Sequence, residues 1–133
     1  MKKAVLFILD EFADWEAAFI STVLTTDEIS GDYEVRWAST DRSPKRSMGH
    51  LTVIPDLAIE EIPQDIDALI LIGGLSWHKE EAKGILPLAR SIKARGGVLG
   101  IICDATHFAA REGLLNDVRH TGNDPSEMAR EGG

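Results

Sequence analysis

The chain has one cysteine, Cys103, in the stretch GIICDATHFAAREGLL, where an apolar run ends and a helical pattern begins. A cysteine thiolate attacks carbonyl carbons and is also readily oxidised. A residue between a strand and a helix occupies the position of a nucleophile elbow, where a tight turn holds the reactive atom above a sheet. Free amides at the start of the helix favour the thiolate. The alternative is that this lone cysteine is a small buried apolar residue.

The small residues around Cys103 match an elbow only in part. Gly100 lies three residues before Cys103 and Ala105 two residues after it, so the spacing GxSxG is not reproduced. The helix start nevertheless brings a backbone amide, that of Asp104, next to the sulfur. This amide is a candidate donor of an oxyanion hole, in which each donor stabilises the transition state by about 2.7–4 kcal/mol.

A second glycine-containing turn follows another apolar run. In GGLSW, residues 73–77, the glycines allow the backbone to approach a ligand closely, and the Gly74 amide is the second candidate oxyanion donor. The alternative is an ordinary strand-to-helix turn in which Ser76 caps the helix.

Acidic side chains follow the first apolar run. Sites in open α/β sheets form at the carboxyl ends of the strands. Asp10, Glu11 and the nearby Glu16 can therefore converge on one crevice with residues 73–78 and 103–107. Glu16 is the candidate partner of the cysteine, and the alternative is a solvated residue in the first turn of a helix, favoured by the helix dipole.

Continuous apolar runs predict the strands that must position these residues. AVLFIL at 4–9, ALILIG at 68–73 and GVLGIIC at 97–103 suit strands covered on both faces, as in a parallel sheet. YEVRWAS at 33–39 alternates instead, and we expect it near a sheet edge. The stretch 47–62 indicates one or two short strands that lead into a turn.

Helical patterns lie between these strands. Residues 14–29 predict a helix with Asp14 as its N-cap, and 78–97 predict one that is broken near Gly84 and Pro87. A third begins at residue 104. The alternation of strands and helices predicts an α/β doubly wound sandwich. After Leu115 the chain is polar, with no further apolar strand or closing helix, so we expect either a small domain or a fragment of a longer chain.

Length and charge exclude several classes of function. The 133 residues fit one domain, 1–133, and 14 Lys and Arg against 22 Asp and Glu give a net charge of −8. This balance argues against nucleic acids and anionic membranes as partners. The apolar run after Lys2 and Lys3 is too short for a signal peptide, and one cysteine forms no internal disulfide. We therefore expect a cytoplasmic protein.

Four motifs in this order resemble those of the ThiJ/PfpI family, part of the class I glutamine amidotransferase-like superfamily. They are Glu16 in DWEAAF, Gly73 and Gly74 in LIGGLSW, Cys103 in GIICDAT, and GLLND followed by RHTGN, over about residues 3–125. The resemblance implies a flavodoxin-like sandwich, with a mainly parallel sheet, that lacks the family's C-terminal strand and helix. It also implies a homodimer without a cofactor, in which a protonated Glu16 hydrogen-bonds the elbow cysteine. Only the protonated form fits this role, because a carboxylate beside a thiolate raises both pKa values.

The sequence departs from the family pattern beside the nucleophile. Many members have histidine directly after the cysteine, where this chain has Asp104, so that dyad is absent. His120 resembles a later histidine that some members place near the nucleophile, and the alternative is a surface loop. His107 lies one helical turn after Cys103 and can face the same pocket, although a solvated helix position is the interpretation we favour.

Two further residues and Gly73 complete the predicted site. Trp77 and His78 follow the glycine turn and are expected at the pocket rim, beside Gly73. We expect no metal, because the four histidines show no ligand spacing and one cysteine cannot form a thiolate cluster.

Two functions of different classes fit the residues. In the first, Cys103 is the nucleophile of an enzyme. The family resemblance implies a hydrolase, or a glyoxalase or deglycase, with a peptide or small-molecule substrate: peptides, amides or dicarbonyls such as methylglyoxal. In the second, the protein is a non-catalytic stress-response or redox-sensing protein that uses the same oxidisable cysteine. A glutamine amidotransferase is disfavoured because no His-x-Glu pair completes its triad. A response-regulator receiver is excluded because Gly73 and Cys103 stand at the strand ends where receivers need aspartate and lysine.

Overall fold

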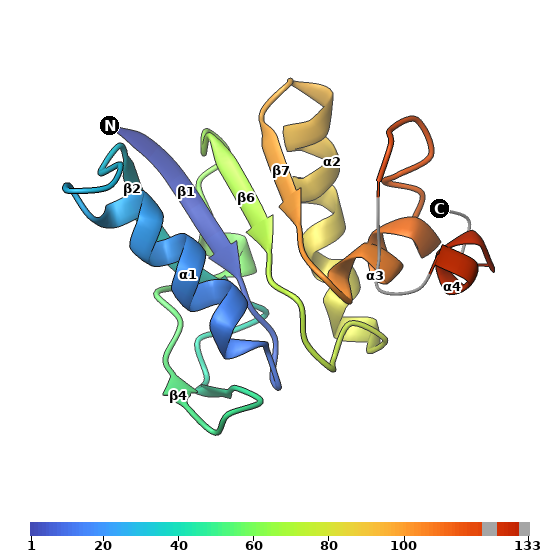
Figure 1. The fold of residues 1–133 in the computed structure, drawn as a ribbon, viewed down its shortest axis with the longest axis horizontal. Helices are drawn as coiled ribbons and strands as arrows, with labels where there is room; N and C mark the ends of the chain where they lie inside the picture. The colour runs from blue at the N-terminus through green and yellow to red at the C-terminus, as the bar shows by residue number, and fades with distance from the viewer. Residues whose placement is uncertain (121–124, 131–133) are drawn as a thin grey trace.

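A five-stranded parallel sheet forms the centre of the protein (Figure 1). The computed structural model describes residues 1–120 and 125–130. The strand order is β5-β2-β1-β6-β7. The bounds are β1 (Lys2–Phe7), β2 (Tyr33–Ser39), β5 (Leu57–Ala58), β6 (Ala68–Leu71) and β7 (Val98–Ile101). The three continuous apolar runs are strands β1, β6 and β7, as predicted, and the alternating strand β2 lies one place from the edge, inside the two-residue β5.

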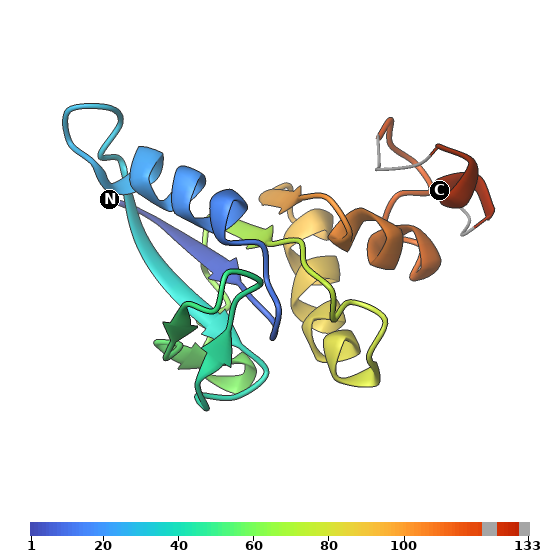
Figure 2. The same cartoon turned by 60° about the horizontal axis from the view of Figure 1, so that its bottom comes forward.

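The two faces of the sheet pack against different helices. Successive residues of a strand point to opposite faces, and in β1 Val5 and Phe7 join the apolar cluster that includes residues of α2 (Leu86–Ala94). Leu6 instead joins the cluster on the side of α1 (Asp14–Thr25). Figure 2 shows α1 and α2 on opposite sides of the sheet. The doubly wound α/β sandwich predicted from the sequence is confirmed.

The second helical region is interrupted where the sequence predicted a break. A 3-10 helix, η2 (Glu80–Ile85), contains Gly84, and α2 begins directly after it with Pro87 in its first turn. Proline is tolerated there because the first amides of a helix have no intrahelical acceptor.

A small antiparallel hairpin, β3 (Lys45–Arg46) and β4 (Thr52–Val53), lies between β2 and β5 in the chain. Figure 1 shows this hairpin at the edge of the molecule toward which the arrows of β1 and β6 point. A second 3-10 helix, η1 (Ile59–Glu61), follows β5. The hairpin therefore adds a wall beside the carboxyl ends of the strands.

The remaining helices are α3 (Ala105–Arg111) and α4 (Pro125–Arg130). The expectation that no helix follows Leu115 is wrong, because α4 is present and its Met128 is buried in the core on the α2 side. A six-residue helix with a single large apolar side chain is too short to produce a periodic signal. In the described part of the chain, no helix has both the length and the apolar character needed to cross a bilayer.

Candidate active site

Cys103 lies in the tight turn between β7 and α3 and has a left-handed backbone. Its φ is +56°, a region that L-residues adopt at a cost of about 1–3 kcal/mol. The turn is fixed from the helix side, because the Thr106 amide and hydroxyl both donate to the Cys103 carbonyl oxygen, at 2.9 and 2.5 Å. A strained residue between a strand and a helix is the geometry of a nucleophile elbow.

Glu16, Gly73 and Cys103 meet although they come from three different elements. The Gly73 amide, just after β6, donates to Oε1 of Glu16 in the first turn of α1 at 3.0 Å. A Cβ placed on Gly73 would lie 2.7 Å from that oxygen and 2.8 Å from the Cys103 Cβ. Glycine is therefore required at position 73. The predicted association of Glu16, Gly73 and Cys103 is a feature of the structure.

The Glu16 carboxyl favours its protonated form. Partial burial is the main cause that raises the pKa of Glu16 above its usual value of 4.5, and the nearby charge of Asp104 acts in the same direction. Hydrogen bonds with the Gly73 amide and the Cys103 side chain oppose this shift without reversing it. A neutral carboxyl beside the sulfur can donate a hydrogen bond to it, whereas a carboxylate can only accept.

The Gly74 amide takes no part in the hydrogen bonds between the loop after β1 and the loop after β6. Phe12 and Gly74 face each other in an antiparallel bridge whose hydrogen bonds run through the flanking residues: Ala13 N–H to the Gly73 oxygen at 2.9 Å, and Leu75 N–H to the Glu11 oxygen at 3.1 Å. In such a pair the two facing amides point away from the partner strand. Because β6 and β7 are neighbours, Gly74 and Asp104 follow the carboxyl ends of adjacent strands.

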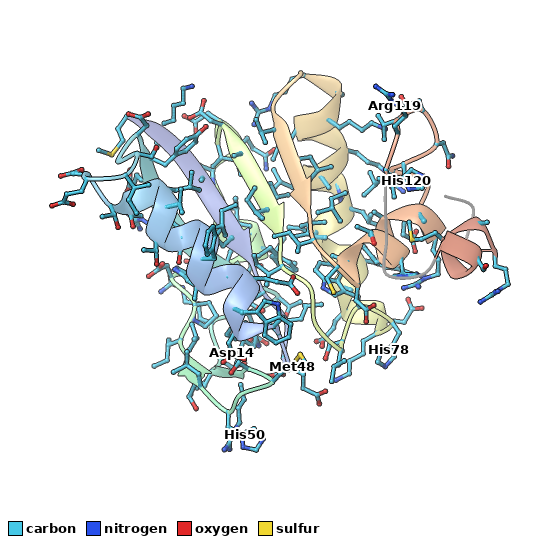
Figure 3. The ribbon with its side chains drawn as sticks, in the orientation of Figure 1. Asp14, Met48, His50, His78, Arg119 and His120 are labelled. Carbon is cyan, nitrogen blue, oxygen red and sulfur yellow. The ribbon has the colours of Figure 1, made fainter. Side chains whose placement is uncertain are left out.

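Trp77 is not at a pocket rim, in contrast to the sequence expectation. It is 3% exposed, donates from Nε1 to the Ile72 oxygen at 2.8 Å, and packs with Phe7 and Phe108 at centroid distances of 6.0 and 4.9 Å. Its indole therefore belongs to the core on the α2 side. His78, the next residue, is exposed on the loop (Figure 3).

The other two candidate histidines have different environments. His107 is 5% exposed, so the interpretation as a solvated helix position is wrong; α3 is buried from Ala105 to Ala110. Figure 3 shows His120 on the loop after α3, away from the carboxyl ends of the strands. Its Nδ1 is buried without a hydrogen-bond partner among the described residues. The structure does not bring His120 together with Glu16 and Gly73.

A cleft of about 480 Å³ opens at the same edge of the sheet. Its lining comes from the end of β1, the β3–β4 hairpin and the loop after β6, and consists of Asp10, Glu11, Arg46, Ser47, Met48, His50, Leu75 and Lys79. Asp10 and Glu11 lie just after β1, at the strand end where the sequence predicts them, but the hairpin wall was not predicted. Polar two-residue strands give no periodic signal by which this wall could be found.

Asp14 fastens the hairpin to the start of α1. Its carboxylate accepts hydrogen bonds from the Ser47 hydroxyl and from the Gly49 amide, the latter at 2.8 Å. The Ser47 hydrogen bond is the main cause that lowers the pKa of Asp14. The prediction of Asp14 as N-cap is wrong: Ala13 is the N-cap, and Asp14 is the first helical residue. The carboxylate that seemed suited to capping its own helix instead holds a loop from elsewhere in the chain (Figure 3).

Within residues 1–120 and 125–130, no three His, Cys, Asp or Glu side chains gather as they would around a metal ion. The chemistry that the described arrangement offers is that of a thiol, a carboxyl with a raised pKa and backbone amides.

The chain is similar in sequence to known proteins. "Uncharacterized protease YdeA" of Bacillus subtilis (strain 168) is 35% identical over 123 residues, which are 92% of this chain and 60% of that protein. "Uncharacterized protease YoaZ" of the same organism is 27% identical over 132 residues, covering 96% of this chain and 63% of that protein. The chain thus spans less than two thirds of the length of these two relatives.

A solved structure and a family model are also similar to this chain. The crystal structure of the DJ-1 superfamily protein Atu0886 from Agrobacterium tumefaciens is similar with a TM-score of 0.85 and 34% identity, over 98% of this chain and 68% of that one. The model of the DJ-1/PfpI family matches residues 2–132. The ThiJ/PfpI resemblance of the sequence is confirmed, and the chain belongs to the DJ-1/PfpI family.

Proposed function

We propose that this protein is a cysteine-dependent enzyme in which Cys103 attacks a carbonyl carbon of an amide or a dicarbonyl. The observation that carries the proposal is the left-handed Cys103 held against a Glu16 carboxyl whose pKa is raised by burial. Strain of this kind clusters at functional sites. The family membership and the names of YdeA and YoaZ, both described as uncharacterized proteases, support a hydrolytic reaction.

The proposed reaction begins with a bond between Sγ of Cys103 and the carbonyl carbon. The π electron pair of the carbonyl moves onto its oxygen, and the Gly74 and Asp104 amides donate to the resulting oxyanion. With an amide substrate, the carbonyl re-forms as the amine departs with a proton from the Glu16 carboxyl. Water then adds to the thioester carbon, the C–S bond breaks to release the Cys103 thiolate and the free acid, and one water proton returns to Glu16. With a dicarbonyl, the first step is addition of the thiol to an aldehyde carbon, and the oxyanion takes up the proton.

The test compares the alkylation rate of Cys103 by iodoacetamide with that of glutathione at about pH 6.5, where an ordinary thiol is about 1% thiolate. We expect Cys103 to react at least about tenfold faster than glutathione. Glu16→Gln should react nearly as fast, because its amide oxygen can still accept from Gly73 while its NH₂ donates to sulfur. Glu16→Ala should react more slowly. A wild-type rate no higher than that of glutathione would make Cys103 a structural residue and overturn the proposal.

The same contact also supports a redox function without turnover. Two equivalents of hydrogen peroxide oxidise a thiol to a sulfinic acid and release two waters, and a protonated Glu16 can donate a hydrogen bond to the ionised sulfinate. Under this alternative, peroxide yields stoichiometric sulfinate at Cys103, while peptide, amide and dicarbonyl substrates show no turnover. Turnover that is lost in Cys103→Ser favours the enzyme.

A further inference from the structure

The cleft at the carboxyl edge of the sheet contains two acidic and two basic side chains that do not neutralise one another. Asp10 and Glu11 follow β1, whereas Arg46 belongs to the hairpin and Lys79 to the loop after β6. Among the described residues, none of these four side chains forms an ion pair, although ion pairs occur at many other places on the surface. Opposite charges that line one cleft and remain unpaired are available to a ligand that carries both charges.

Backbone hydrogen bonds hold three of the four charged residues in position. The Arg46 amide donates to the Asp10 carboxylate at 3.1 Å, and the Glu11 amide donates to the Arg46 oxygen at 2.6 Å. Glu11 has a φ of +60°, an unfavourable conformation for a residue with a side chain. The Glu11 side chain is exposed, so its carboxylate is accessible to a ligand in the cleft.

The cleft adjoins the loop that carries the proposed oxyanion donor. The Glu11 carbonyl accepts from the Leu75 amide at 3.1 Å, and both residues line the cleft. Leu75 directly follows Gly74 in the chain. A ligand in the cleft would therefore contact the residue next to Gly74.

We propose that this cleft binds the zwitterionic part of a short peptide with free ends. Asp10 and Glu11 bind the ammonium group, and Arg46 and Lys79 bind the carboxylate. Met48 and Leu75, which are 40% and 51% exposed, supply apolar contact for the side chains between these ends. The volume of about 480 Å³ lies in the range of small-ligand sites. This proposal rests on the proposed function, because it names a substrate class for the proposed reaction of Cys103 from the cleft that adjoins the Gly74 loop.

Four probes distinguish recognition of the ligand's ammonium group from recognition of its carboxylate. They are the dipeptide Ala-Ala, its N-acetylated form, its C-terminal amide, and the form blocked at both ends. Binding is followed by ¹H–¹⁵N NMR titration of the intact protein under reducing conditions. We expect Ala-Ala to shift the amide signals of Glu11, Leu75 and Lys79. Blocking either end should weaken binding by about tenfold, as expected for the loss of a charge-assisted hydrogen bond. Equal affinity for all four probes, or shifts confined to other parts of the chain, would overturn the proposal.

Two variants assign the charges. Glu11→Gln should abolish most of the penalty for acetylating the amino group while it leaves the penalty for blocking the carboxylate. Lys79→Gln should do the reverse. Glu28→Gln, at an exposed glutamate outside the cleft, is the matched control and should change neither penalty. Acetylation penalties that are the same in Glu11→Gln as in the wild type contradict the assignment of the ammonium site.

The binding assay and the alkylation assay fail independently. Binding of Ala-Ala with an unreactive Cys103 would refute the proposed function and retain the cleft as a binding site. A reactive Cys103 without discrimination among the four probes would retain the proposed function and refute the zwitterion site.

Discussion

Gly73→Ala is the substitution that tests the construction of the site most directly. A Cβ at position 73 would lie 2.7 Å from Oε1 of Glu16, 2.8 Å from the Cys103 Cβ and 2.8 Å from the Ile102 carbonyl oxygen. Two of these three atoms belong to the elbow, and neither is the far end of a flexible side chain. Relief therefore requires that the elbow move relative to β6, or that Glu16 lose its hydrogen bond from the Gly73 amide.

The expected cost is that of overpacking a well-packed position, about 1–3 kcal/mol. Unfolding of a 133-residue domain has an entropy of about 0.28 kcal/mol/K, from the average value per residue. The melting temperature should accordingly fall by roughly 4–11 °C. Displacement of Glu16 from Cys103 should also reduce the alkylation rate of the thiol, because the carboxyl no longer donates to the sulfur.

The control is Gly84→Ala in η2, where the added Cβ meets only the terminal methyl of Ile59, at 3.0 Å. This methyl can move, so we expect a melting temperature within about 2 °C of the wild type. Both variants are measured by thermal unfolding with circular dichroism and by iodoacetamide labelling. If Gly73→Ala melts with the wild type and labels at the same rate, the three segments do not meet as tightly as described, and the argument for Glu16 fails with them.

Three further predictions concern neighbouring contacts. Burial raises the pKa of Glu16, so above about pH 4.5 the folded state keeps a proton that the unfolded state has lost. Ionised Glu16 therefore destabilises the folded protein as the pH rises. Glu16→Gln, which does not ionise, should raise the melting temperature more at pH ~7 than at pH ~4. Hydrogen bonds lower the pKa of Asp14, so the stability advantage of the wild type over Asp14→Asn should shrink as the pH falls below about 4. Trp77→Ala should cost about 3–5 kcal/mol in chemical denaturation, because the indole is buried between two aromatic rings; a loss below about 1 kcal/mol would contradict its placement in the core.

The sequence was sufficient for the parts of the fold that depend on hydrophobic burial. β1 from Ala4 onward and β6 are apolar and buried on both faces, as this pattern predicts. The same expectation is wrong for β7, which lies at the edge of the sheet and is only partly buried, with Val98 54% exposed. The turn at Cys103 between β7 and α3 was also predictable, because it follows from the end of one apolar run and the start of a helix. The contact of Glu16 with Cys103 came from the family resemblance, since residues 87 positions apart share no local pattern.

Features that depend on contacts between distant segments of the chain could not be predicted. Asp14 is well suited to cap a helix, yet its carboxylate binds Ser47 and Gly49 instead. Trp77 follows a glycine turn, where a pocket rim was expected, but the core beside Phe108 offers its indole greater burial. In both cases a tertiary contact outweighed a correct local tendency, as is common where local preferences are worth about 1 kcal/mol.

The backbone strain in this protein has a location that argues for function at one edge. In the described part of the chain, three residues other than glycine have a positive φ: Glu11, His50 and Cys103. At about 1–3 kcal/mol each, their combined cost is comparable to the whole stability of many domains, about 5–15 kcal/mol. Glu11 and His50 line the cleft, and Cys103 forms the turn after β7 at the same edge of the sheet. Strain of this kind clusters at functional sites. The strained residues therefore mark the carboxyl edge as the part of the molecule on which the proposed function is to be tested.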